Sequence, residues 1–153
     1  KIVKNINIFQ SLKSLENAIK ILRKEIPPSV CLIGFAGAPW TLACYMIEGQ
    51  SSKDFINTRT AIWTSYKWFQ ELIQTLIIYI TDKLEMQANA GANVLMIFDS
   101  WSHMIPNNFY KQLAIEPITE IISLLRSTVH FLLGTQIPDI FTAVFGSFAN
   151  SSR

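Results

Sequence analysis

The chain has 153 residues, enough for one domain with its own core, and no Pro/Gly/Ser-rich linker or charge run divides it. Its formal net charge of +2 comes from 13 basic and 11 acidic residues that are scattered along the sequence. This scatter leaves no basic stripe for phosphates, so a nucleic-acid partner is not expected. Half of the residues are hydrophobic and 16% are charged, an apolar-rich balance.

The apolar excess does not predict a membrane span. The most apolar window, Leu72 to Ile80, lies between Glu71 and Asp82 and is far shorter than the roughly 20 apolar residues that a spanning helix needs. The start of the sequence shows no secretory signal, so a cytoplasmic protein is expected. We interpret the excess as surface that further parts of a larger fold would cover.

The cysteines and histidines predict neither a disulfide framework nor a metal site. Cys31 and Cys44 are 13 positions apart without a CxxC pair, and His103 and His130 lack metal-ligand spacing.

The first part of the sequence predicts a helix, a strand and a second helix. Apolar residues recur at helical spacing from Ile8 to Ile26, and Pro27 ends this helix. The apolar run from Val30 to Ala36 is typical of a strand that is buried on both faces. After a turn at Gly37, Ala38 and Pro39, a helix is expected to continue until Gly49.

A second helix pair is expected after the polar GQSSKD segment. Its longer member carries a wide apolar stripe from Trp68 to Leu84 and should be mostly buried. A second buried strand is predicted from Val94 to Phe98, and it ends at Asp99 and Ser100.

The remainder predicts one more helix and a less regular end. Asn107 or Asn108 can cap a helix that runs from about Phe109 toward Leu125, with an interruption at Pro117. Residues Val129 to Leu133 form a possible strand, and the residues after it show weak periodicity.

Helices that alternate with apolar strands predict an α/β fold with a parallel sheet. The sheet is either an open doubly wound sheet or part of a (β/α)₈ barrel. In both, chemistry collects beyond the carboxyl ends of the strands, which here means Gly37 to Tyr45 and Asp99 to His103.

Single residues in these two segments leave alternatives open, since no GxGxxG, P-loop, GxSxG or HExxH motif is present. Ser100 is either a ligand contact or an N-cap for the next turn. Asp99 is either an acid, base or anchor, or a partner for nearby backbone N–H groups. Tyr45 either reaches the mouth of the site or is a core tyrosine. His103 is assigned no role.

The four tryptophans are expected to supply core area. Trp40 and Trp101 follow the two strands, so they are also candidates for the walls of a pocket that holds a flat ligand, whereas Trp63 and Trp68 are predicted only as core residues.

Two sequence blocks carry a specific resemblance. GFAGAPWTLACYMIEG (Gly34 to Gly49) resembles the signature block of the uroporphyrinogen decarboxylase family. QANAGANVLMIFDSW (Gln87 to Trp101) is similar to the segment in which that family's strand ends in FDSW. The resemblance covers about Leu12 to Arg126, as a central fragment, and residues 127–153 do not follow the family pattern.

The resemblance implies that residues 1–153 form part of a single-domain (β/α)₈ barrel, an α/β fold that is incomplete at both ends here. It also implies a homodimer and a carboxy-lyase of haem biosynthesis. That enzyme converts uroporphyrinogen III to coproporphyrinogen III by decarboxylating four acetate side chains. It uses no cofactor, because a protonated pyrrole of the substrate accepts the electrons.

Three site residues are carried over by motif. Tyr45 matches the family's active-site tyrosine, Ser100 its substrate-contacting serine, and Phe98 an aromatic residue that lines the same pocket. The family's arginines, its pyrrole-binding aspartate and its late histidine have no counterpart, so no catalytic residue is assigned and the chain is expected to be inactive alone.

Two rival functions remain. One is a non-catalytic or decayed tetrapyrrole-binding protein. The other is a corrinoid-linked methyltransferase relative, which would hold zinc through histidine and cysteine late in its sequence, and no such cluster is present here.

Overall fold

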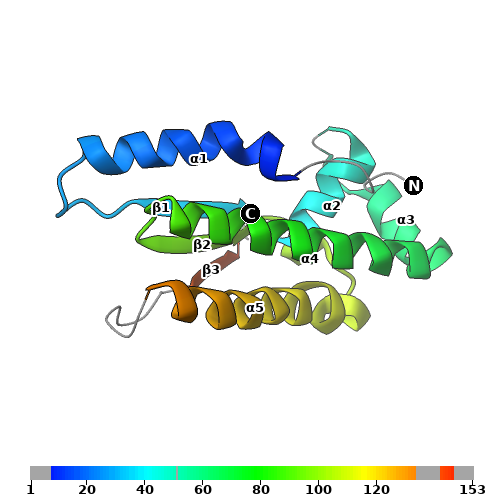
Figure 1. Ribbon diagram of the computed structural model, residues 1–153. Helices are drawn as coiled ribbons and strands as arrows, with labels where there is room; N and C mark the ends of the chain where they lie inside the picture. The colour runs from blue at the N-terminus through cyan, green and yellow to red at the C-terminus, as the bar shows by residue number, and fades with distance from the viewer. Residues whose placement is uncertain (1–7, 51, 134–141, 147–153) are drawn as a thin grey trace, which may run out of the picture.

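The computed structural model describes residues 8–50, 52–133 and 142–146, in which helices alternate with three strands (Figure 1). The helices are α1 (Ile8–Glu25), α2 (Pro39–Glu48), α3 (Ile56–Thr64), α4 (Tyr66–Asn89) and α5 (Glu116–Leu133), and the strands are β1 (Ile33–Gly37), β2 (Val94–Asp99) and β3 (Thr142–Gly146). Between β2 and α5 lie the 3₁₀ turns η1 (Ser102–Met104) and η2 (Asn107–Phe109) and the π-helix η3 (Lys111–Ile115).

The strands form one parallel sheet in the order β1-β2-β3. Strand β1 pairs with β2 from Ile33↔Val94 to Gly37↔Phe98, and Asp99 at the end of β2 pairs with Gly146 of β3. Figure 1 shows α4 between α1 and α5, and α4 packs against both. The predicted α/β class and parallel sheet are therefore confirmed, because helical connections return each strand in the same direction.

The sheet is covered on one face. Gly34 and Ala36 of β1 and Leu95 and Ile97 of β2 are buried on the side that meets the helices. Of the intervening side chains, Ile33 is 47%, Phe35 58% and Phe98 37% exposed, while Val94 and Met96 are half-buried. The prediction of strands buried on both faces is therefore wrong for the described chain. Successive side chains of a strand point to opposite faces, and here the helices pack against only one of them.

The first helices match the sequence pattern closely. Helix α1 was predicted from Ile8 to Ile26 and extends from Ile8 to Glu25. Helix α2 ends where Gly49 takes a left-handed conformation with φ of 69°, and its N–H donates to the carbonyl of Tyr45. A residue without Cβ adopts this conformation without steric cost, so the predicted stop is confirmed.

The core centres on the apolar stripe of α4, which is buried as predicted at six positions: Phe69, Ile73, Leu76, Ile77, Ile80 and Leu84. Trp68 was assigned to the same stripe but is 46% exposed, because consecutive helical residues are about 100° apart and only Phe69 faces inward. Trp63 is 63% exposed and packs edge-on against Phe109 with ring centroids 4.8 Å apart. The expectation that these two tryptophans supply core area is wrong.

The segment before α5 has an irregular helical geometry that follows from Pro117. Proline has no N–H and its ring clashes with the carbonyl of the residue four positions earlier, so regular α-helical bonding is blocked at this point. The structure relieves the conflict with the π-helix η3, which ends immediately before α5. The interruption expected at Pro117 is thus confirmed.

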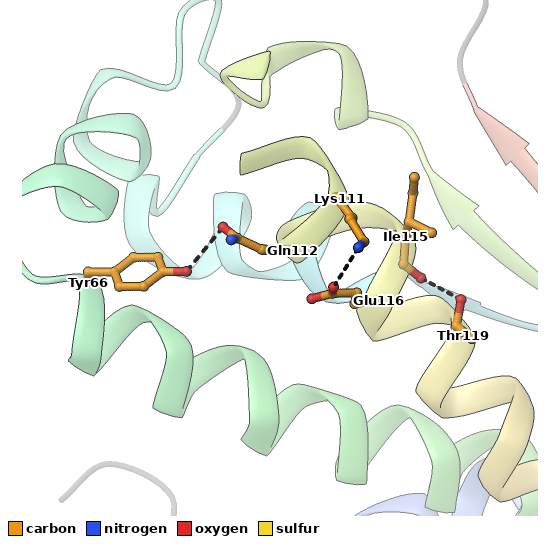
Figure 2. Close-up of polar contacts among 6 residues, drawn as sticks. All are labelled: Tyr66, Lys111, Gln112, Ile115, Glu116 and Thr119. Atoms are coloured by element: carbon orange, nitrogen blue, oxygen red, sulfur yellow. Dashed lines mark hydrogen bonds and ion pairs between the residues drawn. The ribbon is translucent and has the colours of Figure 1, made fainter. Parts of the chain in front are cut away.

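Figure 2 shows the contacts that hold this junction. The Tyr66 hydroxyl lies 3.3 Å from Gln112 Oε1, Lys111 Nζ lies 3.9 Å from Glu116 Oε1, and Thr119 Oγ1 donates to the carbonyl of Ile115.

Two predictions for the later sequence are wrong. Turn η2 has Pro106 at its N-cap and no side-chain cap, so neither Asn107 nor Asn108 caps a helix there. Helix α5 continues through residues 129–133, where a strand was considered possible, because no proline or glycine occurs between Pro117 and Gly134 to end it. No helix among the described residues is long and apolar enough to cross a membrane.

Candidate functional site

The candidate site lies where the carboxyl ends of β1 and β2 meet the start of α2. The backbone N–H of Ala38 donates to the carbonyl of Phe98 at 2.7 Å and joins the β1–α2 turn to the end of β2. Pro39 then occupies the first turn of α2, where its missing N–H costs nothing. This arrangement brings residues 37–45 beside residues 98–103, as expected from the sequence.

Tyr45 is at the surface of this edge and is not a core residue. Its side chain is 44% exposed, and its hydroxyl oxygen accepts a hydrogen bond of 2.9 Å from the indole Nε1 of Trp101. The two rings meet edge to face with centroids 6.5 Å apart. Of the two alternatives for Tyr45, the structure supports the one in which its hydroxyl is accessible.

Phe98 lies on the open face of the sheet. Its ring packs edge-on against Phe35 with centroids 5.9 Å apart, and in the strand register it stands opposite Gly37. An aromatic surface at the end of the strands suits a flat ligand, because ring faces and edges stack favourably.

Ser100 directly follows β2 and is partly buried. The turn η1 after it has Trp101 at its N-cap and no side-chain cap, so Ser100 does not act as the predicted cap. Ser102 helps to close the turn instead, because its hydroxyl donates to the carbonyl of Asp99 at 3.1 Å. Ser100 therefore retains a hydroxyl at the strand end without a capping role.

Asp99 is buried, with 2% of its surface exposed. Its Oδ1 accepts a hydrogen bond of 2.8 Å from the Thr41 hydroxyl, and Oδ2 has no hydrogen-bond partner among the described residues. The alternative in which Asp99 serves nearby backbone N–H groups is therefore wrong. Burial raises the pKa of this carboxyl to about 6, while the Thr41 hydrogen bond and the charge of His103 oppose the rise.

A cavity of about 260 Å³ adjoins Asp99 and extends toward the start of α5. Besides Asp99 it is lined by Ser102, Tyr110, Ala114, Ile115, Ile118 and Thr119. It lies on the helix-covered side of β2, because Asp99 alternates with the exposed Phe98.

Other reactive groups near the strand ends are poorly placed for chemistry. Burial raises the pKa of the Cys44 thiol to about 12, so its nucleophilic thiolate is scarce at neutral pH. Within the described ranges no group of three or more His, Cys, Asp or Glu side chains could hold a metal ion. The accessible groups are hydroxyls and aromatic rings, which can bind and orient a ligand.

Sequence reasoning did not single out Thr41, and for Trp40 its core expectation is confirmed while its pocket-wall alternative is wrong. Trp40 is fully buried and donates through Nε1 to the carbonyl of Trp101, so it supports the site from the core and does not wall a pocket. Trp101 is partly buried, between Phe55 and Tyr45. Because these partners are about 60 positions apart along the sequence, no local pattern could have linked them.

Comparison with known proteins places the chain in a family. The model of the family described as uroporphyrinogen decarboxylase (URO-D) matches residues 1–145. Among curated proteins, the chain is 38% identical over 149 residues to the uroporphyrinogen decarboxylase of Coxiella burnetii (strain RSA 493 / Nine Mile phase I), a match that covers 94% of the chain and 40% of that relative.

Two further relatives have the same description. The uroporphyrinogen decarboxylase of Legionella pneumophila (strain Paris) is 35% identical over 139 residues, or 91% of the chain and 37% of the relative. That of Gluconobacter oxydans (strain 621H) is 41% identical over 120 residues, or 78% of the chain and 34% of the relative. The chain thus spans 34–40% of the length of these relatives. On the family match over residues 1–145, the chain belongs to the uroporphyrinogen decarboxylase family.

Proposed function

We propose that this chain contributes a substrate-binding edge to an enzyme that decarboxylates the four acetate side chains of uroporphyrinogen III to give coproporphyrinogen III. The observation that carries the proposal is the meeting of the two family-like blocks at the carboxyl ends of adjacent parallel strands, where Tyr45 and Phe98 are exposed. In parallel α/β folds ligands bind at this edge.

The reaction replaces a carboxylate by a proton, so each acetate becomes a methyl group and CO₂ leaves. The electron pair left behind enters the substrate's own protonated pyrrole, which makes a cofactor unnecessary. Tyr45 and Ser100 would supply hydroxyl hydrogen bonds to the polar groups of the tetrapyrrole, and Phe98 would pack against one of its pyrrole rings. We assign these residues binding and orienting roles and no role in proton transfer.

The complete enzyme is proposed to be a single-domain (β/α)₈ barrel that forms a homodimer in the cytoplasm. The parallel sheet with helices on one face supports the barrel, since the inner face of such a sheet faces the other strands. Because the chain spans 34–40% of its relatives, we propose that it is not competent for decarboxylation alone.

A chimera tests the proposal. Residues 34–101 of this chain replace the matched segment of the Coxiella burnetii enzyme, and coproporphyrinogen formation is measured for the chimera and for the isolated 153-residue chain. We expect the chimera to form product and the isolated chain to form none. Loss of the hydroxyl in a Tyr45→Phe chimera should lower kcat/KM by about 10- to 100-fold, the effect of removing one hydrogen bond to a charged group.

Tyr79→Phe is the matched control, because Tyr79 lies on α4 among residues that do not line the strand ends, and it should leave kcat/KM unchanged. A chimera that is folded by circular dichroism but forms no product would contradict the proposed function. Turnover by the isolated chain would contradict the proposal that it is incompetent alone.

A further inference from the structure

Trp101 is attached to helix α2 at three points. Its backbone N–H donates to Thr41 Oγ1 at 3.3 Å, its carbonyl accepts from the indole of Trp40 at 2.8 Å, and its own indole donates to the Tyr45 hydroxyl at 2.9 Å. Because Trp40, Thr41 and Tyr45 belong to one helix, both the main chain and the side chain of Trp101 are fixed relative to that helix.

Asp99 determines how the Thr41 hydroxyl is used. A threonine hydroxyl has one proton and two lone pairs, and here the proton is donated to Asp99 Oδ1 at 2.8 Å. A lone pair of the same oxygen is thereby directed to the backbone N–H of Trp101. A buried carboxylate at the end of β2 thus orders the hydrogen bonds that hold the next turn.

The direction of the hydrogen bond between the Trp101 indole and the Tyr45 hydroxyl determines what Tyr45 can offer to a ligand. An indole nitrogen only donates, so the Tyr45 oxygen must be the acceptor of the bond from Trp101. The phenolic proton is left for another acceptor, and the side chain is 44% exposed. Tyr45 is therefore oriented as a hydrogen-bond donor toward the open edge of the sheet.

We propose that Asp99, Thr41 and Trp101 are positioning residues that form a hydrogen-bond relay and present the Tyr45 hydroxyl as a donor to an anionic oxygen of the bound ligand. This inference rests on the proposed function, which supplies a ligand with carboxylates at Tyr45. It assigns Asp99 a role through other residues and no contact with the ligand.

The relay can be tested by changing the charge of Asp99, because protonation of its carboxyl should alter the hydrogen bond that it accepts from Thr41. The titratable groups that face it are the Cys44 thiol of α2, His103 of η1 and Tyr110, which lines the same cavity. Since burial raises the pKa of the carboxyl to about 6, its protonation changes the acceptor strength of Oδ1 near that pH. A change at Asp99 should then be felt at Trp101 through Thr41.

The first experiment titrates the ¹⁵N-labelled, ligand-free 153-residue chain from about pH 4.5 to 8, a range that brackets the carboxyl pKa. The indole N–H signal of Trp101 is assigned by its loss in Trp101→Phe, and the backbone N–H signal by sequential assignment of the chain. We expect both signals to shift with a midpoint near pH 6, because burial raises the pKa of Asp99 to about 6. The transition should disappear in Asp99→Asn, which preserves shape and keeps an acceptor for Thr41.

A His103→Gln control separates the carboxyl from the imidazole that packs on Trp101 with centroids 6.0 Å apart. The transition should remain in this variant. Wild-type Trp101 signals that stay flat across the range, or a transition that His103→Gln removes, would overturn the relay.

The second experiment uses two buried threonines that both donate to a carboxylate. Thr41 donates to Asp99 and Thr58 donates to Glu48 Oε1 at 3.0 Å, outside the relay. Thr41→Val should shift the Trp101 indole signal and the ¹³C signal of the hydroxyl-bearing ring carbon of Tyr45. Thr41→Ser should restore both signals, and Thr58→Val should leave them in place.

Equal shifts in Thr41→Val and Thr58→Val would overturn the relay, because they would reflect a general loss of packing. If Thr41→Val does not fold, the titration of wild type and Asp99→Asn decides the question. Neither experiment contains a tetrapyrrole, so a failed relay leaves the chimera result standing. Conversely, suppose that the chimera folds but is inactive while the Trp101 signals shift near pH 6. That combination overturns the proposed function and not the relay.

Discussion

The two faces of strands β1 and β2 have different surroundings although their residues alternate along the same two strands. The face toward the helices carries small or aliphatic side chains, and Ala36 and Ile97 there are at most 1% exposed. The opposite face carries Phe35 and Phe98, whose rings contact each other and remain substantially exposed. The difference teaches that the helices stabilise one face, whereas the other face is available to further strands or to a ligand.

The largest expected loss of stability comes from truncating a side chain on the covered face. Ile97→Ala removes a fully buried side chain and leaves a cavity, so the free energy of unfolding should fall by about 2–5 kcal/mol. Phe35→Ala removes a larger but 58% exposed side chain and should cost about 1 kcal/mol or less. Urea unfolding of both variants measures the two values. Equal losses would mean that the two faces contribute alike to stability.

The next effect concerns the buried carboxyl at the end of the covered face. Burial raises the pKa of Asp99 from an ordinary 3.8 to about 6. Between these pH values the folded state binds more protons than the unfolded state, so the unfolding free energy falls as pH rises. The favourable contribution is complete below about pH 4 and is lost as pH passes through about 6.

Asp99→Asn should remove this dependence. The variant should match the wild type near pH 4 and exceed it by about 2–3 kcal/mol at pH 7, since each unit of pKa shift corresponds to about 1.4 kcal/mol. Urea unfolding at several pH values gives the difference between the two proteins. A difference that does not change with pH would show that Asp99 titrates alike in the folded and unfolded states.

A smaller effect tests how tightly the covered face is packed. A Cβ added at Gly34 would lie 3.1 Å from the Cβ atoms of Ala92 and Gln87 and from Gln87 Oε1. The same Gln87 amide bonds both the N–H and the carbonyl of Phe35, so it has little freedom to move. Gly34→Ala should therefore cost about 1 kcal/mol in the free energy of unfolding.

The matched enlargement on the open face is Ile33→Phe, at a position that is 47% exposed. It should change the free energy of unfolding by about 0.5 kcal/mol or less in either direction. If Ile33→Phe proved as costly as Gly34→Ala, the open face would be as closely packed as the covered one.

The smallest effect lies on the solvent side of the η3–α5 junction. The side chains of Lys111 and Glu116 are 79% and 55% exposed and their charged atoms lie 3.9 Å apart, as Figure 2 shows. Lys111→Ala should cost about 0–0.5 kcal/mol, because water screens an exposed pair. Thermal unfolding at low and high salt measures this, and a loss above about 1 kcal/mol would show that the junction depends on the pair.

The sequence predicted the elements whose patterns are local. The period of apolar residues located α1 and α4, and Gly49 and Pro117 marked where regular helical bonding ends or changes. The same patterns failed where burial depends on neighbours. Trp63 and Trp68 are as apolar as Trp40, yet only Trp40 is buried, because exposure depends on which helix face meets the sheet.

The sequence by itself determined the family-like blocks and the order of helices and strands as far as β2, and with it the positions of Tyr45 on α2 and of Phe98 and Ser100 at the end of β2. These follow from residue identity and short-range spacing. The tertiary structure alone decided that Asp99 bonds Thr41 and that Trp101 bonds Tyr45. Such partners are more than 50 positions apart, and they meet because parallel strand pairing brings the ends of β1 and β2 to one edge.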